Sequence, residues 1–127
     1  MNKIRIMIVD DEAPFTRLLK INLERTGDYA VQVENNPQAA FRAAAEFRPE
    51  LILMDVMMPG MDGGTLASTF QANESFRHVP IVFLTAAVKR EEVQAHHGII
   101  GGQPFLAKPV DLAELTSCLR QHLRVSA

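Results

Sequence analysis

The sequence has little cysteine and few large aromatic residues, with one cysteine, one tyrosine and no tryptophan among 127 residues. A single cysteine excludes an intrachain disulfide and a thiol-rich metal site, and it gives no reason to expect an oxidising compartment. No apolar run is long enough to span a membrane, and no signal-peptide core follows the first residues. We therefore expect a cytoplasmic protein without membrane contact.

The sequence also has no large excess of positive or negative charge. It contains 13 Lys and Arg residues and 15 Asp and Glu residues, for a formal net charge of −2. No basic block or stripe stands out, so we expect no direct contact with nucleic acid. The length and the 47% hydrophobic content suit one globular domain over residues 1–127.

Short apolar runs that alternate with helical patterns predict the fold. Five runs predict strands, at about residues 4–9, 29–33, 51–55, 81–84 and 105–107. The segments between and after them predict five helices, at about residues 14–26, 37–48, 65–70, 89–97 and 112–123. Asp111 is expected to cap the last helix, and Leu18 and Leu112 are expected on buried helix faces. This alternation predicts an α/β domain, a doubly wound five-stranded parallel sheet with helices on both faces.

Five polar residues stand where these apolar runs end. In a doubly wound sheet, the working site lies at the carboxyl ends of the strands, where the winding reverses. A lone aspartate at a strand end often only opens a turn, but here the end residues are chemically complementary: Asp10, Asp11, Asp55, Thr85 and Lys108.

This set of residues suits phosphoryl chemistry. Three carboxylates in one crevice repel one another unless a cation lies among them, and an all-oxygen site suits Mg²⁺ together with phosphate oxygens. Lys108 supplies a cationic donor, Thr85 supplies a hydroxyl, and Asp55 is a carboxylate that can form an aspartyl phosphate. The residue types therefore predict phosphoryl transfer onto Asp55.

Four motifs in order resemble the receiver domain of two-component response regulators. They are Val-Asp-Asp-Glu at 9–12, Met-Asp-Val-Met-Met-Pro-Gly-Met-Asp-Gly at 54–63, Leu-Thr-Ala at 84–86 and Lys-Pro at 108–109. The resemblance covers essentially the whole chain. It implies a flavodoxin-like sheet with strand order 2-1-3-4-5.

The resemblance also implies the roles of the site residues. Asp55 would be the phosphoacceptor, and it would hold Mg²⁺ together with Asp10, Asp11 and the backbone carbonyl of Met57. The phosphoryl oxygens would be bound by Thr85 and Lys108, the latter aimed by a cis peptide bond to Pro109.

A signalling switch rather than an enzyme is the function that the resemblance implies. A sensor histidine kinase or a histidine phosphotransfer protein would phosphorylate the chain. Thr85 and Phe105 would then move together and change the surface made by the fourth helix, fifth strand and fifth helix, where an unknown protein target binds. We expect a single-domain regulator of the chemotaxis or phosphorelay type, because no effector sequence follows Arg124. The alternative is a receiver fragment of a larger regulator.

Three other functions compete with this interpretation. A dehalogenase-like phosphatase needs an Asp-x-Asp pair, whereas Asp10 and Asp11 are adjacent and no insertion could form a substrate cap. A flavodoxin-like flavin binder needs amides and hydroxyls in its first loop, where these acids and Glu12 would repel a phosphate. A receiver-like interaction module that works without phosphorylation is disfavoured by the complete set of acids, threonine and lysine.

The chain also departs from the family pattern near residue 101. Gly101-Gly102-Gln103-Pro104-Phe105 replaces the usual Gly-Ala-x-x-aromatic stretch, so a short or frayed fourth helix is expected. The family often has tyrosine at the position of Phe105, which lacks the tyrosine hydroxyl. The inward position of the Phe105 ring should therefore cost little free energy.

Several further residues have simple interpretations. Apolar Met57 and Ala87 cannot orient an attacking water, so a long-lived phosphorylated state is expected. His96 and His97 do not share a helix face and are expected in solvent, while Cys118 and the methionines are expected to serve packing.

Overall fold

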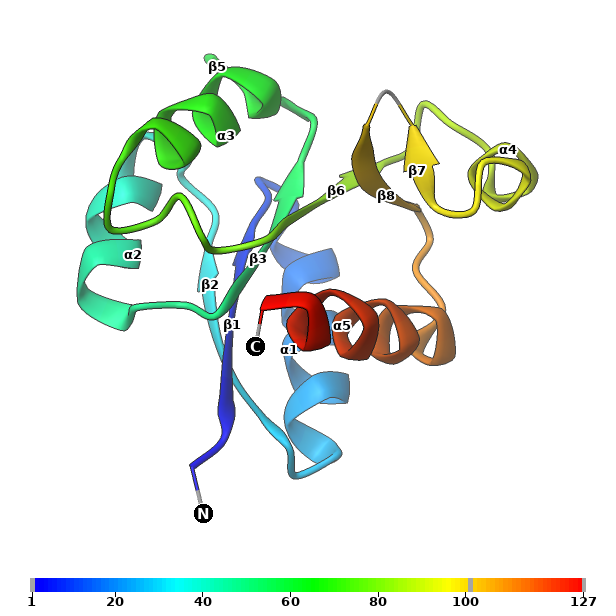
Figure 1. The fold of residues 1–127 in the computed structure, drawn as a ribbon, viewed down its shortest axis with the longest axis horizontal. Helices are drawn as coiled ribbons and strands as arrows, with labels where there is room; N and C mark the ends of the chain where they lie inside the picture. The colour runs from blue at the N-terminus through cyan, green and yellow to red at the C-terminus, as the bar shows by residue number, and fades with distance from the viewer. Residues whose placement is uncertain (1, 101, 127) are drawn as a thin grey trace.

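The computed structural model describes residues 2–100 and 102–126 and shows a sheet between two layers of helices (Figure 1). The order of the strands across the sheet is β2-β1-β3-β6-β8-β7. These strands are β1 (Ile4–Val9), β2 (Tyr29–Glu34), β3 (Leu51–Asp55), β6 (Ile81–Thr85), β7 (Ile99–Ile100) and β8 (Gln103–Ala107). The first five strands of that order are parallel, which confirms the predicted sheet. The sixth, β7, is antiparallel to β8 and was not predicted.

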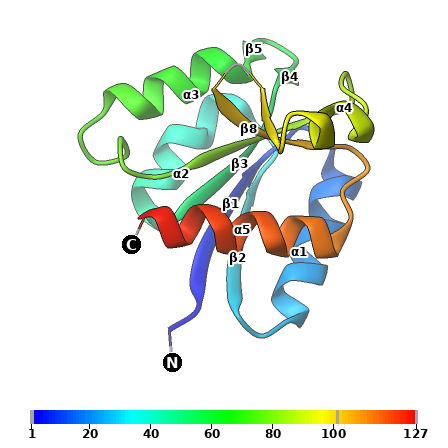
Figure 2. The same ribbon diagram turned by 45° about the vertical axis from the view of Figure 1, so that its right-hand side comes forward.

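Helices cover both faces of the sheet (Figure 2). They are α1 (Ala13–Arg25), α2 (Ala40–Phe47) preceded by the 3₁₀ turn η1 (Pro37–Ala39), α3 (Gly63–Ala72), α4 (Arg90–Ala95) and α5 (Leu112–Ser126). A separate hairpin of β4 (Met57–Met58) and β5 (Met61–Asp62) lies between β3 and α3. Among the described residues, no helix combines the length and the apolar character needed to cross a membrane.

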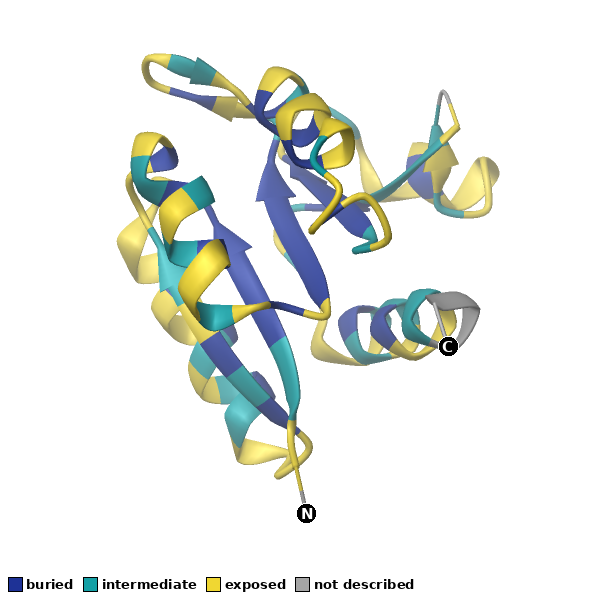
Figure 3. Cartoon of the chain, turned by 60° about the vertical axis from the view of Figure 1, so that its left-hand side comes forward, coloured by how far each residue is buried: buried dark blue, intermediate teal, exposed yellow. Residues whose placement is uncertain are grey.

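Alternate residues of the central strands point to two different hydrophobic cores. On one face, Ile6 and Ile8 of β1 pack with leucines of α1 and α5. On the other face, Met7 and Val9 pack with residues of α2 and α3. Every residue of β3 and β6 is buried, as Figure 3 shows for the centre of the sheet. Continuous apolar runs therefore occur where a parallel sheet is covered on both sides.

Side-chain caps begin three of the helical segments. Asn36 accepts a hydrogen bond from the Gln38 amide at 3.1 Å before η1. Asp62 accepts one from the Gly64 amide at 3.1 Å before α3, and Asp111 accepts one from the Ala113 amide at 3.0 Å. The prediction that Asp111 caps the last helix is confirmed.

Two leucines that were predicted to be buried are exposed. Leu18 is 60% exposed because α1 faces the sheet through Leu19 and Leu23, and Leu18 lies beside that stripe rather than within it. Leu112 is 38% exposed because it is the first residue of α5 and borders an open surface groove beside Thr26.

The α4 region differs most from the expected fold. The predicted helix over residues 89–97 is confirmed only for Arg90–Ala95, so the expectation of a short helix holds. His97 and Gly98 then adopt left-handed conformations, with φ of 56° and 80°, which end the helix. The chain turns back at once into β7, and the Phe105 amide donates to the Gly98 carbonyl at 2.8 Å. Gly101 lies outside the described residues.

Candidate functional site

Three carboxylates meet at the carboxyl edge of the sheet. Asp10 follows β1 and Asp55 ends β3, and because these strands are parallel neighbours their ends lie side by side. One carboxylate oxygen from each of Asp10, Asp11 and Asp55 lies within 4.8 Å of the others. Asp10 is fully buried and Asp55 is 6% exposed, whereas Asp11 is open to solvent. The predicted convergence of these acids is confirmed.

Lys108 extends into this acidic pocket from the end of β8. Its Nζ lies 2.7 Å from Asp10 Oδ2, 2.6 Å from Glu12 Oε1 and 3.6 Å from Asp55 Oδ1. The ammonium also lies 4.6 Å from the centre of the Phe15 ring, a distance at which the ring face attracts a cation. The Lys108–Pro109 peptide bond is cis, as the resemblance implies.

Burial and mutual repulsion control the protonation of the acids. Burial raises the pKa of Asp55 to about 6, and the negative charge of Asp10 adds to the rise, while the Lys108 ammonium opposes it. Burial also raises the pKa of Asp10, against the opposing effect of the Lys108 contact. Burial alone would lower the pKa of Lys108, but the carboxylates of Asp10 and Glu12 outweigh it and hold the pKa above its ordinary value. The lysine is therefore a permanent cation in this pocket.

The donor set fits a hard divalent cation. Asp10 Oδ2 is buried and accepts no hydrogen bond from any described residue, although the Lys108 ammonium lies beside it as an ion-pair partner. Three converging carboxylate oxygens match the ligand chemistry of Mg²⁺, which keeps several waters and takes few carboxylates. The backbone amide of Met57 lowers the pKa of Asp55, against the effect of burial. The role of the Met57 carbonyl as a further ligand stays a prediction.

Thr85 and Phe105 lie on the neighbouring strands β6 and β8, with Phe105 two residues before the partner of Thr85 in the register. Thr85 is buried at the end of β6, and its hydroxyl accepts a hydrogen bond from the Ala87 amide at 3.0 Å. Phe105 is half-buried in β8, paired in register with Phe83, and their ring centres are 5.3 Å apart. The Phe105 ring also lines a hollow of about 270 Å³ between α4, β8 and α5, with Val93 among the other lining residues.

Three contacts of the pocket were missed by sequence reasoning. Glu12 and Phe15 both hold the Lys108 ammonium, and Gly63 packs so closely that a Cβ there would lie 2.0 Å from the Asp55 carbonyl oxygen. The adjacency of Glu12 to the two aspartates was a usable indication of its role. The contact of Gly63 depends on the path of the hairpin, which the sequence does not show.

Other residues singled out in the sequence lie away from this pocket. His96 and His97 are exposed, as predicted. Cys118 is half-buried, and burial raises the pKa of its thiol to about 11, which agrees with a packing role. The packing role predicted for the methionines is wrong for Met57, whose residue surface is 74% exposed because it opens the short hairpin after β3.

The fold and the pocket together define a doubly wound α/β domain with an acidic site at the point where the winding reverses. Residues 6–120 match the model of the response regulator receiver domain, and the chain belongs to that family. Receiver domains are signalling switches that histidine kinases phosphorylate, and they bind Mg²⁺ at the acidic pocket.

Several proteins of known name are similar to the chain. The phosphate regulon transcriptional regulatory protein PhoB of Pseudomonas aeruginosa is 37% identical over 120 residues, which are 94% of this chain and 51% of PhoB. The DNA-binding dual master transcriptional regulator RpaA of Synechocystis is 32% identical over 94% of this chain and 49% of RpaA. The chain thus spans about half the length of these relatives. The crystal structure of a response regulator from Desulfuromonas acetoxidans has a TM-score of 0.78 and 27% identity, covering 96% of this chain and 98% of that chain.

Proposed function

We propose that this receiver domain accepts a phosphoryl group on Asp55 in a Mg²⁺-dependent reaction and then changes its affinity for a protein partner. The observation that carries the proposal is the position of Asp55. Its carboxylate oxygens lie both beside those of Asp10 and Asp11 and 3.6 Å from the Lys108 ammonium. The Asp55 carboxylate therefore borders the candidate metal ligands and a candidate phosphate donor at the same time.

The chemistry is an in-line transfer from a phosphohistidine or a small acyl phosphate. A carboxylate oxygen of Asp55 forms the new bond to phosphorus while the bond from phosphorus to the donor nitrogen or oxygen breaks, and the leaving group keeps that electron pair. The ionised carboxylate is the nucleophile, and with a pKa of about 6 most Asp55 side chains are ionised at neutral pH. Asp10, Asp11, Asp55 and the backbone carbonyl of Met57 would hold Mg²⁺, which would neutralise charge on the phosphoryl oxygens.

Lys108 and Thr85 would stabilise the product. Lys108 would exchange part of its contact with Asp10 and Glu12 for a phosphoryl oxygen, which needs only a small movement of a flexible side chain. The Thr85 hydroxyl would turn from the Ala87 amide toward the phosphoryl group. This turn would free space on the side of β6 that faces β8.

The Phe105 ring and the surface around it would carry the change to a partner. The ring already borders the hollow between α4, β8 and α5, so a shift of the ring would reshape that surface. Arg90 links the same elements, because it pairs with Glu114 of α5 at 2.9 Å and donates to the Pro109 carbonyl at 2.8 Å. Movement near Lys108 would therefore reach α4 through direct contacts.

The partners follow from the family. A sensor histidine kinase or a histidine phosphotransfer protein would be the phosphoryl donor, and the downstream target would be a protein. PhoB and RpaA are named transcriptional or DNA-binding regulators, so the absence of direct nucleic-acid contact stays a prediction for this chain. A single domain over residues 1–127 and a cytoplasmic location also stay predictions.

A slow loss of the phosphoryl group is a further part of the proposal. Met57 and Ala87 are exposed and apolar, so neither side chain can hold an attacking water by hydrogen bonding. The Met57→Asn, Ala87→Glu double variant should lose the phosphoryl group several-fold faster than the native chain. An equal or slower loss in the variant would refute this part alone.

Intact mass after incubation with acetyl phosphate tests the proposed phosphorylation directly. The native chain with Mg²⁺ should gain the mass of one phosphoryl group, and Asp55→Asn or an excess of chelator should abolish the gain. Asp28→Asn removes an exposed acid far from the pocket in sequence and serves as the matched control, which should label like the native chain. Labelling of Asp55→Asn at the native level would show that the proposal is wrong.

A further inference from the structure

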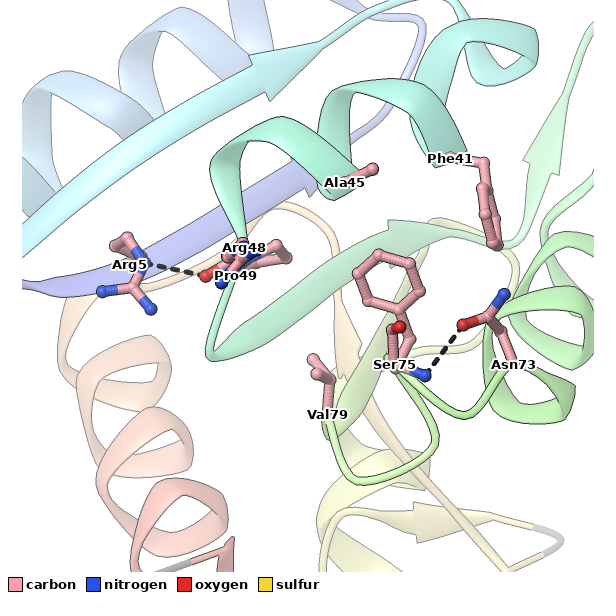
Figure 4. A pocket seen from close by; sticks show the side chains of 9 residues that line it. Arg5, Phe41, Ala45, Arg48, Pro49, Asn73, Ser75 and Val79 are labelled. Carbon is pink, nitrogen blue, oxygen red and sulfur yellow. Dashed lines mark hydrogen bonds between the residues drawn. The ribbon is translucent and has the colours of Figure 1, made fainter.

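A cleft at the amino ends of the strands, opposite to the acidic pocket, has no part in the proposed phosphorylation. It lies between the end of α2, the start of β3 and the loop after α3, and its volume is about 550 Å³ (Figure 4). This volume falls in the range of about 300–1,000 Å³ that is typical of small-molecule pockets. The acidic pocket lies at the other end of strands of five to six residues, which separates the two sites by roughly 17 Å.

The walls of the cleft are aromatic and firmly packed. Phe41 of α2 and Phe76 of the loop after α3 both line it, and their ring centres are 5.2 Å apart in an edge-to-face arrangement. Behind them, the fully buried Phe70 ring lies 5.1 Å from Phe41 and 5.2 Å from Phe76. The packing of the three rings fixes the two that line the cleft, and the half-buried Phe41 offers a flat ligand more apolar surface than the buried Phe76.

One end of the cleft carries two guanidinium groups. Arg5 is anchored there, because its Nε donates to the Arg48 carbonyl at 2.7 Å and its Nη1 lies 3.5 Å from Glu50 Oε1. Arg48 is different, since its side chain makes no ion pair or hydrogen bond with any described residue. Arg48 also has a left-handed backbone, with φ of 57°, at a helix end where glycine or asparagine is usual. An arginine without an ion-pair partner among the described residues thus stands where the left-handed backbone is unfavourable for its residue type.

The other end of the cleft carries neutral hydrogen-bonding groups. Asn73 and Ser75 lie there, away from the two arginines (Figure 4). The Asn73 side-chain oxygen accepts from the Ser75 amide at 2.8 Å, which leaves the Asn73 amino group and the Ser75 hydroxyl without partners among the described residues. No residue that lines the described cleft carries a carboxylate. The lining is therefore rich in donors and positively charged.

We propose that this cleft binds a small organic anion with a flat apolar body. The carboxylate or phosphate of the ligand would pair with Arg48 and Arg5, the flat body would lie against Phe76 and Phe41, and an acceptor at its far end would meet Asn73. Charge complementarity selects an anion, because two arginines line the cleft, none of the lining residues is acidic, and only Arg5 has an acidic partner among the described residues.

Two fluorescent probes that differ only in charge test the proposal on the full chain. 1-Anilinonaphthalene-8-sulfonate carries a sulfonate, and N-phenyl-1-naphthylamine is the same ring system without it. The native chain should bind the anionic probe at one saturable site. Arg48→Gln should weaken that binding about tenfold, the loss expected for one charge-assisted contact, and should leave binding of the neutral probe unchanged.

Arg42→Gln is the matched control, because it removes an exposed arginine of α2, the helix that Arg48 follows, and Arg42 does not line the cleft. It should change neither affinity. Ala45→Phe fills the cleft from an exposed position of α2 and should abolish binding of the anionic probe while the thermal unfolding midpoint stays close to native. Unchanged probe binding in Ala45→Phe, or an equal effect of Arg42→Gln and Arg48→Gln, would overturn the proposal.

Competition identifies the head group of the ligand. Phenyl phosphate and phenylacetate should displace the anionic probe, and the tighter competitor shows whether the arginine end prefers phosphate or carboxylate. Failure of both competitors at millimolar concentration would contradict the proposed site. Asp55→Asn should bind the probe like the native chain, so the outcome is independent of the proposed phosphorylation.

Discussion

The two halves of the sheet are built differently. In the half made by β1 and β3, the strand residues beside the acidic pocket are buried on both faces and covered by four helices. In the half made by β8 and β7, three of the five residues of β8 are only half-buried, and α4 buries Val93 alone. Elements with few buried apolar contacts open and shift at low cost in free energy. The comparison indicates that the proposed phosphorylation would use carboxylates held by the rigid half, while the proposed response of the surface would come from the loosely packed half.

The largest expected effect lies at the rigid half. Gly63→Ala would place a methyl group 2.0 Å from the Asp55 carbonyl oxygen, so the backbone of the hairpin or of Asp55 would have to move. We expect a loss of at least about 3 kcal/mol in the free energy of unfolding, the upper end of the usual cost of overpacking, measured by urea denaturation. Gly64→Ala is the control, because its Cβ would meet Asp62 Oδ1 at an ordinary 3.6 Å. Equal losses in the two variants would show that the tight approach is unimportant.

The buried charge of Asp55 predicts a pH-dependent effect of the next size. The pKa of Asp55 rises from 3.8 in the unfolded chain to about 6 in the folded chain. Above pH 7 and without Mg²⁺, keeping the buried carboxylate ionised therefore lowers the free energy of unfolding by roughly 3 kcal/mol. The penalty is absent below about pH 3, where the carboxyl is protonated in both states, and it grows as the pH rises from the unfolded pKa of 3.8 to the folded pKa of about 6. Asp55→Asn should therefore be more stable than the native chain at pH 7.5, with the difference vanishing near pH 3. A difference that does not change with pH would contradict this account.

Thr85→Ala sharpens the comparison at the border between the halves. The variant removes the partly buried hydrogen bond from the Ala87 amide to the Thr85 hydroxyl, which should lower the free energy of unfolding by about 1 kcal/mol. Labelling of Asp55 by acetyl phosphate should stay largely intact, because the carboxylates and Lys108 are unchanged. The gain in partner affinity on phosphorylation should disappear, as measured by pull-down with and without beryllofluoride. Equal gains in the variant and the native chain would exclude a role of Thr85 in coupling.

The smallest effect is expected in the loosely packed half. Arg90→Gln removes the exposed ion pair with Glu114 and the contact with the Pro109 carbonyl, and should cost about 0.5 kcal/mol. Amide hydrogen exchange of residues 90–95 should nevertheless become several-fold faster, since few other contacts hold α4. Arg5→Gln, which removes the exposed pair with Glu50 in the other half, should leave exchange of β1 unchanged. Equal acceleration in both halves would erase the distinction between them.

The strand ends could be predicted from the sequence, and the contacts between distant elements could not. Asp10, Asp55 and Lys108 follow apolar runs, and parallel strands place such ends together by geometry alone. The helical period marked the buried stripe of α1 correctly through Leu19 and Leu23 but not its edge at Leu18.

The misses have physical causes of their own. A two-residue strand such as β7 is too short to show a period, and left-handed residues before it redirect the chain without a hydrophobic pattern. The cleft beside Arg48 depends on three segments that are far apart in the sequence. No single segment therefore marks its aromatic residues as the wall of a site.

Hydrogen exchange with and without beryllofluoride and Mg²⁺ tests the central claim most directly. Beryllofluoride would mimic the proposed phosphoryl group on Asp55, so the account predicts changed exchange over residues 86–107, in α4, β7 and β8, and unchanged exchange in β1 and β3. In Asp55→Asn, beryllofluoride and Mg²⁺ should change exchange in neither half of the sheet. Changes spread evenly over both halves, or the same changes in Asp55→Asn, would contradict the claim that a rigid site on one half drives a loosely packed surface on the other.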